Sequence, residues 1–285
     1  MNMNKYVRFL VTEFLYNGHL QSLGAGGLIV IATKLLFNTS APLEFFIATY
    51  ALFETIFIFD RYHDLDWDSL TNTVRSKHLL LYRNKIPFIF AAYVIVFTSF
   101  FYYFSGIEML LVSVVVCIAG MLYPVYFKKL TKKIPLFKNI YVSAVYMPLA
   151  FFPALYLSTS PVRDILAIHL PIVVFVESFI AQLILDTKDR ESDSKAHLKT
   201  LPALVGNTKT MITAACLAVA LAAASTLVSI FTHAPFSFGL LTFAALFIDF
   251  YMIYRIRMGD KNGYLLAAAK LFIWLVIFLA SSLLV

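Results

Sequence analysis

Two acidic segments interrupt a chain that is otherwise 61% hydrophobic and only 14% charged. The first is "FDRYHDLDWDSLTNTVR", in which three aspartates recur every four residues: Asp60, Asp64 and Asp68. The second is "LILDTKDRESDSKAHLKTLPALVG", in which three aspartates follow intervals of three and four residues: Asp186, Asp189 and Asp193. Both spacings would align the carboxylates along one face of a helix, with about 6 Å between neighbours.

Aligned carboxylates repel one another, and at the C-terminal end of a helix they also oppose its dipole. A divalent cation removes both penalties, and Mg²⁺ prefers a few carboxylates together with water and phosphate oxygens. A single triad could be a solvated helix end, but two equivalent triads favour a shared site for Mg²⁺ and a diphosphate. We therefore predict catalytic roles for all six aspartates. Four of them are predicted as direct metal ligands: Asp60, Asp64, Asp189 and Asp193.

Basic side chains accompany the acidic segments and could bind phosphate oxygens. Arg75 and Lys199 follow the two triads at a short and similar distance. Lys188 lies inside the second segment, and Lys128 follows the sequence "LYPVYF". Each of these cations taken alone could instead be a solvated charge or an orientation signal. Together they predict a set of substrate-binding residues.

The rest of the chain consists of apolar stretches of about 20 residues, the length of a membrane-spanning helix. Nine of them can be placed, near residues 19–38, 42–60, 86–104, 107–127, 139–158, 163–185, 209–231, 235–254 and 264–284. The alternating polarity of a membrane β-barrel is absent from the sequence. The sequence therefore predicts an all-α, polytopic membrane protein. Residues 1–285 are expected to form one domain of nine transmembrane helices around a central, lipid-accessible cavity.

The net charge of +7 comes from an uneven distribution of Lys and Arg. Of the 23 basic residues, 20 lie before the first apolar segment or in the connections after the even-numbered ones. Because basic connections stay in the cytoplasm, this predicts a cytoplasmic N-terminus and cytoplasmic acidic loops. We expect an integral protein of a bacterial inner membrane. Its charge then reflects topology and attraction to membrane lipid, and does not indicate nucleic-acid binding.

The chain resembles the UbiA superfamily of intramembrane prenyltransferases over essentially its whole length. The family's first motif, NxxxDxxxD followed by an arginine, is matched by Asp60, Asp64, Asp68 and Arg75. Its second motif, a DxxxD core followed by K/R-T-L-P, is matched by Asp189, Asp193 and residues 199–202. Aspartate at position 60 replaces the usual asparagine, and "VRSKHLL" lacks the proline that often follows the family's arginine.

This resemblance implies Mg²⁺ as the cofactor, an isoprenyl diphosphate as the donor, and a lipophilic or aromatic acceptor. The stretch "LYPVYFKKLTKKIP" is similar to the family's tyrosine-proline and basic segment, so Tyr123 is expected to contact the pocket or the diphosphate. The family chemistry forms an allylic cation in an apolar cavity that keeps water away from it. The acceptor then attacks this cation.

Polar residues near the start of the first apolar segment could position the acceptor. Asn17 and His19 lie there, and Gln182 lies one turn before Asp186 on the same face. A structural, hydrogen-bonded role is the alternative for His19. The neighbouring glycines are expected to permit close helix packing: Gly24, Gly26 and Gly27.

Two other functions are compatible with parts of this pattern. Within the same superfamily, a terpene cyclase would quench the cation internally and need no acceptor. In a different class, a cation transporter would need ionisable groups near the bilayer midplane, where the clear acids are Glu54 and Glu177. Because the aspartate triads fall at the ends of the apolar segments, transport ranks below both enzymes.

Overall fold

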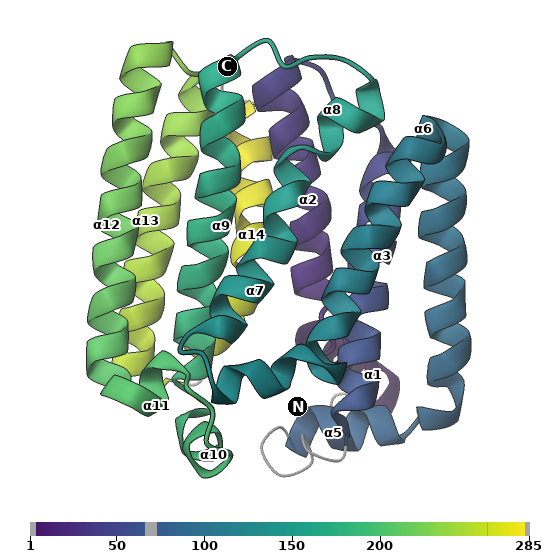
Figure 1. Ribbon diagram of the computed structural model, residues 1–285, viewed down its shortest axis with the longest axis vertical. Helices are drawn as coiled ribbons and strands as arrows, with labels where there is room; N and C mark the ends of the chain where they lie inside the picture. Colours follow the sequence, from purple (N-terminus) through teal and green to yellow (C-terminus); the bar gives the residue numbers. More distant parts are fainter. Residues whose placement is uncertain (1–3, 66–72, 261, 283–285) are drawn as a thin grey trace.

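Long helices standing side by side form the body of the protein (Figure 1). The structure is a computed structural model, and it describes residues 4–65, 73–260 and 262–282. Across these ranges the chain forms helices and connections and contains no strand. The prediction of an all-α fold is confirmed.

The upright helices are α2 (His19–Phe37), α3 (Leu43–His63), α6 (Ile86–Val125), α7 (Phe137–Tyr146), α8 (Phe152–Leu157), α9 (Asp164–Asp186), α12 (Asn207–Thr232), α13 (Phe236–Arg257) and α14 (Asn262–Ser282). Shorter elements gather at the lower end of Figure 1, and these are α1 (Lys5–Tyr16), α5 (Thr73–Leu80), η1 (Arg83–Lys85), η2 (Phe127–Lys132), α10 (Arg190–Lys195) and α11 (Leu201–Val205). The 3₁₀ turn η3 (Met147–Ala150) joins α7 to α8. The boundaries of the upright helices agree closely with the apolar segments in the sequence.

Seven helical stretches of the described residues are long and apolar enough to cross a membrane. The protein is therefore an integral membrane protein. One of the seven, Arg83–Val125, bends at Gly106, whose φ of 84° and ψ of −169° are not helical. Helix α3 is as long as the others, but its charged side chains keep it out of this set: Glu44, Glu54, Asp60 and Arg61.

Helix α2 packs against α14 through glycine. A Cβ atom at Gly24 would lie 2.6 Å from the Leu271 Cβ, and one at Gly27 would lie 2.8 Å from the Leu275 Cβ. Both distances are shorter than a carbon contact allows, so only glycine lets the two helices approach this closely. The predicted role of these glycines in helix packing is confirmed.

The interior of the bundle is rich in aromatic side chains. Phe45 on α3 stacks on Tyr156 on α8, with 4.0 Å between ring centroids. The α7–α8 stretch is interrupted near two prolines, which cannot donate a helical hydrogen bond: Pro148 is the second residue of η3, and Pro153 is the second residue of α8. The chain therefore crosses this part of the bundle as two short helices joined by a 3₁₀ turn.

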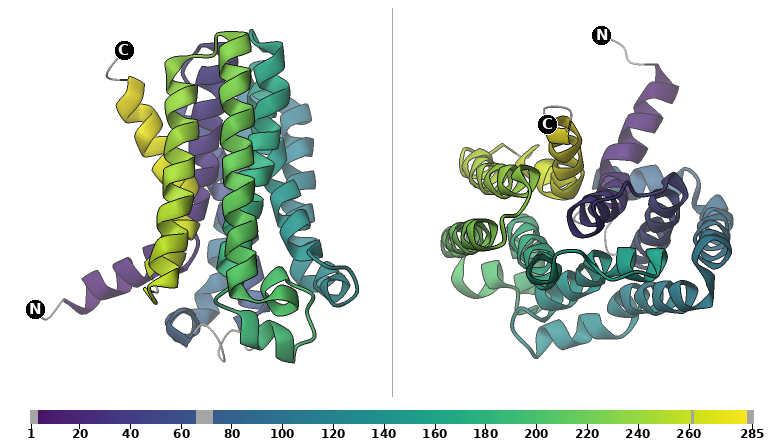
Figure 2. Two further views of the ribbon diagram at one scale, coloured as in Figure 1. Left: turned by 90° about the vertical axis from the view of Figure 1, so that its left-hand side faces the viewer. Right: turned by 90° about the horizontal axis from the view of Figure 1, so that it is seen from above.

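Helix α1 and the last turn of α14 lie at opposite ends of the bundle (Figure 2). The N-terminal helix α1 and the short helices α5, α10 and α11 share one end (Figure 1). Helices α3 and α9 also terminate at this end, so both acidic segments are brought there.

Candidate active site

The second acidic segment does not continue as one helix. Helix α9 ends at Asp186, a turn follows, and Asp189 caps the short helix α10. The prediction that Asp186, Asp189 and Asp193 share one helical face is therefore wrong. Turning the chain after Asp186 separates the three carboxylates, so each one acquires its own surroundings.

Asp186 is fully buried and is bound by two side chains of α7. The Lys138 ammonium forms an ion pair with Oδ1, and the Asn139 amide donates to Oδ2 at 2.8 Å. Both carboxylate oxygens thus have protein partners, and the charge is neutralised locally. Asp186 ties α9 to α7 and presents Lys138 at the site. The sequence analysis missed both partners, although Lys138 continues the basic stretch that follows "LYPVYF".

Asp193 and Asp189 are less completely enclosed by protein. Thr200, in the K-T-L-P segment, donates to Asp193 Oδ2 at 2.9 Å. Burial raises the pKa of Asp193 to about 6, because the positive charge of Lys138 and the Thr200 bond do not offset it. Burial also raises the pKa of Asp189, against the opposing influence of nearby cations. Both carboxylates are therefore poised to gain from a cation.

The K-T-L-P segment is joined to the basic stretch after α6 by backbone hydrogen bonds. The Lys199 N–H donates to the Thr131 carbonyl at 2.9 Å, and the Leu136 N–H donates to the Lys199 carbonyl at 3.0 Å. The Lys199 ammonium donates to the Lys133 carbonyl at 3.1 Å. These contacts hold the second acidic segment against the loop that carries Lys128.

The first acidic segment lies at the C-terminal end of α3. Asp60 is in the last turn, and Asp64 caps the helix by donating its N–H to the Asp60 carbonyl at 2.9 Å. The Asp64 carboxylate pairs with Lys128 and with His63, the latter at 3.0 Å. Asp68 lies outside the described residues.

Side chains from distant parts of the sequence meet between the two acidic segments. The charges of Lys138, Asp186 and Asp60 all act on the Tyr123 hydroxyl, which lies 3.3 Å from the Thr131 hydroxyl. Burial raises the pKa of Asp189, and the positive charges of Lys188, Lys138 and, more weakly, Arg75 on α5 oppose this rise. The positive charge of the arginine that follows the first segment therefore acts on an aspartate of the second. This brings together most of the residues that the sequence singled out.

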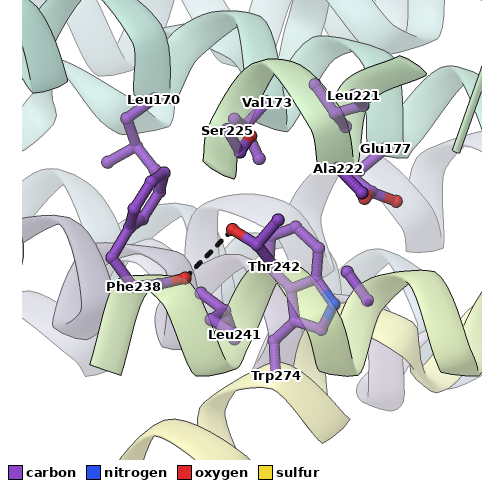
Figure 3. A pocket seen from close by; sticks show the side chains of 11 residues that line it. Leu170, Val173, Glu177, Leu221, Ala222, Ser225, Phe238, Leu241, Thr242 and Trp274 are labelled. Carbon is purple, nitrogen blue, oxygen red and sulfur yellow. Dashed lines mark hydrogen bonds between the residues drawn. The ribbon is translucent and has the colours of Figure 1, made fainter. Parts of the chain in front are cut away.

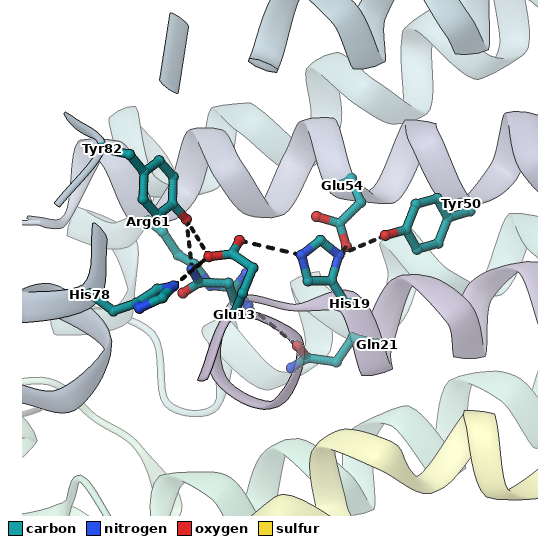
Figure 4. Close-up of polar contacts among 9 residues, drawn as sticks. Glu13, His19, Gln21, Tyr50, Glu54, Arg61, His78 and Tyr82 are labelled. Carbon is teal, nitrogen blue, oxygen red and sulfur yellow. Dashed lines mark hydrogen bonds and ion pairs between the residues drawn. The ribbon is translucent and has the colours of Figure 1, made fainter. Parts of the chain in front are cut away.

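A second polar cluster joins α1, α2 and α3, where the sequence placed acceptor-binding residues (Figure 4). His19 Nδ1 lies 2.6 Å from the Tyr50 hydroxyl and 2.9 Å from Glu54, and Nε2 lies 3.3 Å from Glu13. The Asn17 amide donates to Glu13 and to the Tyr82 hydroxyl, both at 2.8 Å. His19 and Asn17 are thus held in a hydrogen-bonded network, and their role toward an acceptor stays a prediction.

Residue Gln182 is half-buried on α9, one turn before Asp186. The remaining predicted cation, Lys188, is exposed beside Asp189.

Among the described residues, no group of three or more His, Cys, Asp or Glu side chains is arranged to hold a metal ion by itself. Any metal held here would therefore need oxygen ligands from water or substrate as well as from aspartate.

Buried charge also occurs in the middle of the bundle, and the sequence analysis overlooked most of it. Lys270 on α14 pairs with Glu177 on α9 and with Asp249 on α13. Each of the three side chains is at most 4% exposed. A small cavity beside Glu177 is lined by mostly apolar residues together with Ser225, Thr242 and Trp274 (Figure 3). Asp249 is an intramembrane acid in addition to Glu54 and Glu177.

A model of one protein family matches most of this chain. It is the UbiA prenyltransferase family, and the match spans residues 22–280. The chain belongs to the UbiA prenyltransferase family. A search of the curated proteins finds no match.

Solved structures of UbiA homologues share this fold. The apo structure of a UbiA homolog from Aeropyrum pernix K1 has a TM-score of 0.71 and 16% identity, and the match covers 93% of this chain and 97% of that one. A UbiA homolog from Archaeoglobus fulgidus bound to GPP and Mg²⁺ has a TM-score of 0.67 and 13% identity, covering 94% and 98%. A digeranylgeranylglyceryl phosphate synthase has a TM-score of 0.57 and 16% identity, covering 98% and 100%. The UbiA fold thus extends over nearly the whole chain.

Proposed function

We propose that this protein transfers an isoprenyl group from a prenyl diphosphate to a lipophilic or aromatic acceptor within the membrane, with Mg²⁺ as its cofactor. The observation that carries the proposal is the meeting of the two acidic segments at one end of the bundle. There Arg75, which follows the first segment, acts on Asp189 of the second. Family membership and the UbiA homolog bound to GPP and Mg²⁺ support the same chemistry.

The aspartates fit Mg²⁺ by their chemistry. Asp60, Asp64, Asp189 and Asp193 would contribute hard carboxylate oxygens, which Mg²⁺ prefers. Asp193 is bonded to protein through Oδ2, so Oδ1 would be the oxygen that binds the metal. Asp186 has both oxygens bound by α7, so its role is to hold Lys138 in place. When bound, Mg²⁺ would stabilise negative charge on the departing diphosphate.

Basic residues around the aspartates would bind the diphosphate. Arg75 and Lys138 approach Asp189 from two different elements, and Lys128 pairs with Asp64. Their charges would stabilise the leaving group as its bond to the allylic carbon breaks. Tyr123 would orient an oxygen of the substrate, and Lys188 and Lys199 would add positive charge at the rim.

The acceptor would bind toward α2, where Asn17 and His19 lie, with Gln182 facing it from α9. The aromatic interior of the bundle would keep water from the allylic cation and could stabilise its charge. The buried triad gives no support to cation transport, because Lys270 occupies both of its carboxylates.

The predicted topology belongs to this proposal. Nine spans result if α6 is divided at Gly106, α7 and α8 count as one span, and α3 is included despite its charges. Because α1 and the last turn of α14 lie at opposite ends of the bundle, the chain between them crosses it an odd number of times, which nine spans satisfy. The excess of Lys and Arg at the site end supports a cytoplasmic site. The nine spans would enclose a lipid-accessible cavity for the prenyl chain.

The decisive experiment incubates purified protein with Mg²⁺ and prenyl diphosphates of several chain lengths, with and without an aromatic acceptor. Transfer predicts diphosphate release that depends on Mg²⁺, together with a prenylated acceptor. Chelation of Mg²⁺ by EDTA is the control. A cyclic hydrocarbon or terpene alcohol formed without acceptor would identify a cyclase, and no diphosphate release with any donor would refute both.

A further inference from the structure

The Glu13 carboxylate on α1 is the centre of a network that reaches α5. It accepts hydrogen bonds from His78 Nε2 at 2.6 Å and from the Tyr82 hydroxyl at 2.7 Å. His78 lies on α5, and Tyr82 follows α5 directly. The Asn17 amide and His19 complete the set of partners. Figure 4 shows the side chains of His19, His78 and Tyr82 converging on Glu13.

These contacts are specific and partly enclosed. The His78 side chain is only 5% exposed, and the Phe9 ring of α1 packs on it with 4.5 Å between centroids. Burial alone would raise the pKa of Glu13, but the hydrogen bonds from His19, Tyr82, His78 and Asn17 lower it to about 2. Glu13 is therefore ionised at neutral pH, and its bonds to α5 are charge-assisted and strong.

Helix α5 is only eight residues long, and it carries Arg75 one turn before His78. So short a helix is unstable alone and depends on its packing for its orientation. Its buried side chains are Ser76, His78 and Leu79, and α1 is its principal neighbour. Fixing His78 therefore fixes the rotation of α5, and with it the direction of Arg75.

We propose that Glu13 is a positioning residue for diphosphate binding, which acts by holding His78 and Tyr82 and thereby the helix that carries Arg75. This inference rests on the proposed function. The side chains bonded to Glu13 are those of Asn17, His19, His78 and Tyr82, and none of these four is an aspartate. Helix α1 projects sideways from the bundle in Figure 2. Through Glu13 it would contribute to diphosphate binding by orienting α5.

The test separates the two substrates kinetically. For Glu13→Gln, we expect the KM for the prenyl diphosphate to rise about tenfold, as befits loss of a charge-assisted bond. The KM for the acceptor should stay within about twofold. His78→Ala should raise the donor KM similarly, whereas His78→Gln, which keeps a side-chain donor, should recover part of the loss. Amide hydrogen exchange of residues 73–80 should become faster in Glu13→Gln.

Double variants show whether the effect passes through Arg75. In an Arg75→Ala background, adding Glu13→Gln should change the donor KM less than twofold, because the group that it positions is gone. The matched control is Asp260→Asn, which removes another ion-paired carboxylate at the same end, bound by Arg255 and by the Asn262 N–H at 2.8 Å. This control should leave the donor KM unchanged.

Each outcome has a distinct meaning. An unchanged donor KM in Glu13→Gln, or a rise confined to the acceptor KM, would overturn the positioning role while the proposed transfer stands. Additive effects of Glu13→Gln and Arg75→Ala would also overturn it. Absence of diphosphate release by the unaltered protein would refute the proposed function, and the inference with it. Thermal unfolding of each variant shows whether a lost activity reflects a lost fold.

Discussion

Carboxylates at the end of the bundle and carboxylates in its middle differ in how the protein neutralises their charge. In the middle, Glu177 and Asp249 share Lys270, and all three side chains are buried. At the end, burial raises the pKa of Asp189 and Asp193, and the positive charges of nearby lysines do not offset it. The mid-bundle acids are already neutralised by protein, whereas the end acids still gain from a cation.

The difference shows how one residue type serves two purposes in the same chain. A buried charge that the protein pairs itself contributes to the choice of helix partners. A carboxylate left with spare oxygens at a helix end can bind a metal and its substrate. Asp186 belongs to the first kind despite its place in the second acidic segment, because Lys138 and Asn139 bind it fully.

The largest effect should come from removing an aspartate at the bundle end. Asp64→Ala or Asp189→Ala should lower kcat by about a thousandfold, because charge on the departing diphosphate loses its stabilisation. The unfolding temperature in detergent should change little, since neither carboxylate holds the core. Steady-state diphosphate release and a thermal melt measure both quantities. Near-normal turnover in either variant would remove the distinction between the two groups of acids.

A change in the middle of the bundle should instead lower stability and leave turnover intact. Lys270→Met leaves two buried carboxylates opposed, which should lower the free energy of unfolding by roughly 3–5 kcal/mol. Turnover per folded molecule should stay close to that of the unaltered protein. Unfolding titrations in mixed detergent give the stability. The triple variant Lys270→Met, Glu177→Gln, Asp249→Asn should recover most of the loss, and its failure to do so would argue against simple charge pairing.

A smaller effect is expected from pH, because protons compete with Mg²⁺ for the carboxylates at the bundle end. Asp193 has a raised pKa of about 6, so its ionised form prevails above that pH and is lost as the pH falls through it. Apparent Mg²⁺ affinity should therefore decline by about tenfold per pH unit below about 6. Titration of Mg²⁺ at pH 5 to 8 measures this dependence. Asp193→Asn should flatten the curve, and an unchanged slope in that variant would assign the proton elsewhere.

The smallest effect is expected for His19. His19→Ala removes contacts to Tyr50, Glu54 and Glu13, so the acceptor loses a fixed polar group. We expect kcat/KM for the acceptor to fall roughly three- to tenfold, with little change in the donor KM. Kinetics with the acceptor varied at saturating donor provide the measurement. A matching fall for the donor would place His19 with Glu13 as a support of α5.

The sequence predicted helix boundaries well because apolar length is a property of each segment alone. Hydropathy places α9 and α12–α14 within a few residues, and it needs no knowledge of neighbours. The chemistry of the two acidic segments was likewise readable from residue type and spacing. Their predicted single-face geometry failed after Asp186, because the helix ends there and a turn follows.

What the sequence could not supply were partners from distant segments. The binding of Asp186 by Lys138 and Asn139 depends on how α7 packs against α9, and no local pattern encodes it. The same holds for Glu13 and His78, which are 65 residues apart. A signal did exist for the mid-bundle triad, because a lysine inside an apolar span requires an acidic partner. Lys270 could have led to Asp249 and Glu177.

The Lys270 triad also bears on how the chain enters the membrane during its synthesis. A lone lysine or aspartate at the centre of a newly made helix opposes insertion by roughly 2.5–3.5 kcal/mol. Helices α13 and α14 are joined by a short connection, so Asp249 and Lys270 can meet as a hairpin and enter lipid with their charges already paired. Glu177 belongs to α9, which is made earlier. Glu177 is therefore already in the membrane when the hairpin enters, and it can then bind Lys270. The last helix made, α14, is thus held by this ion pair as well as by the glycine contacts with α2.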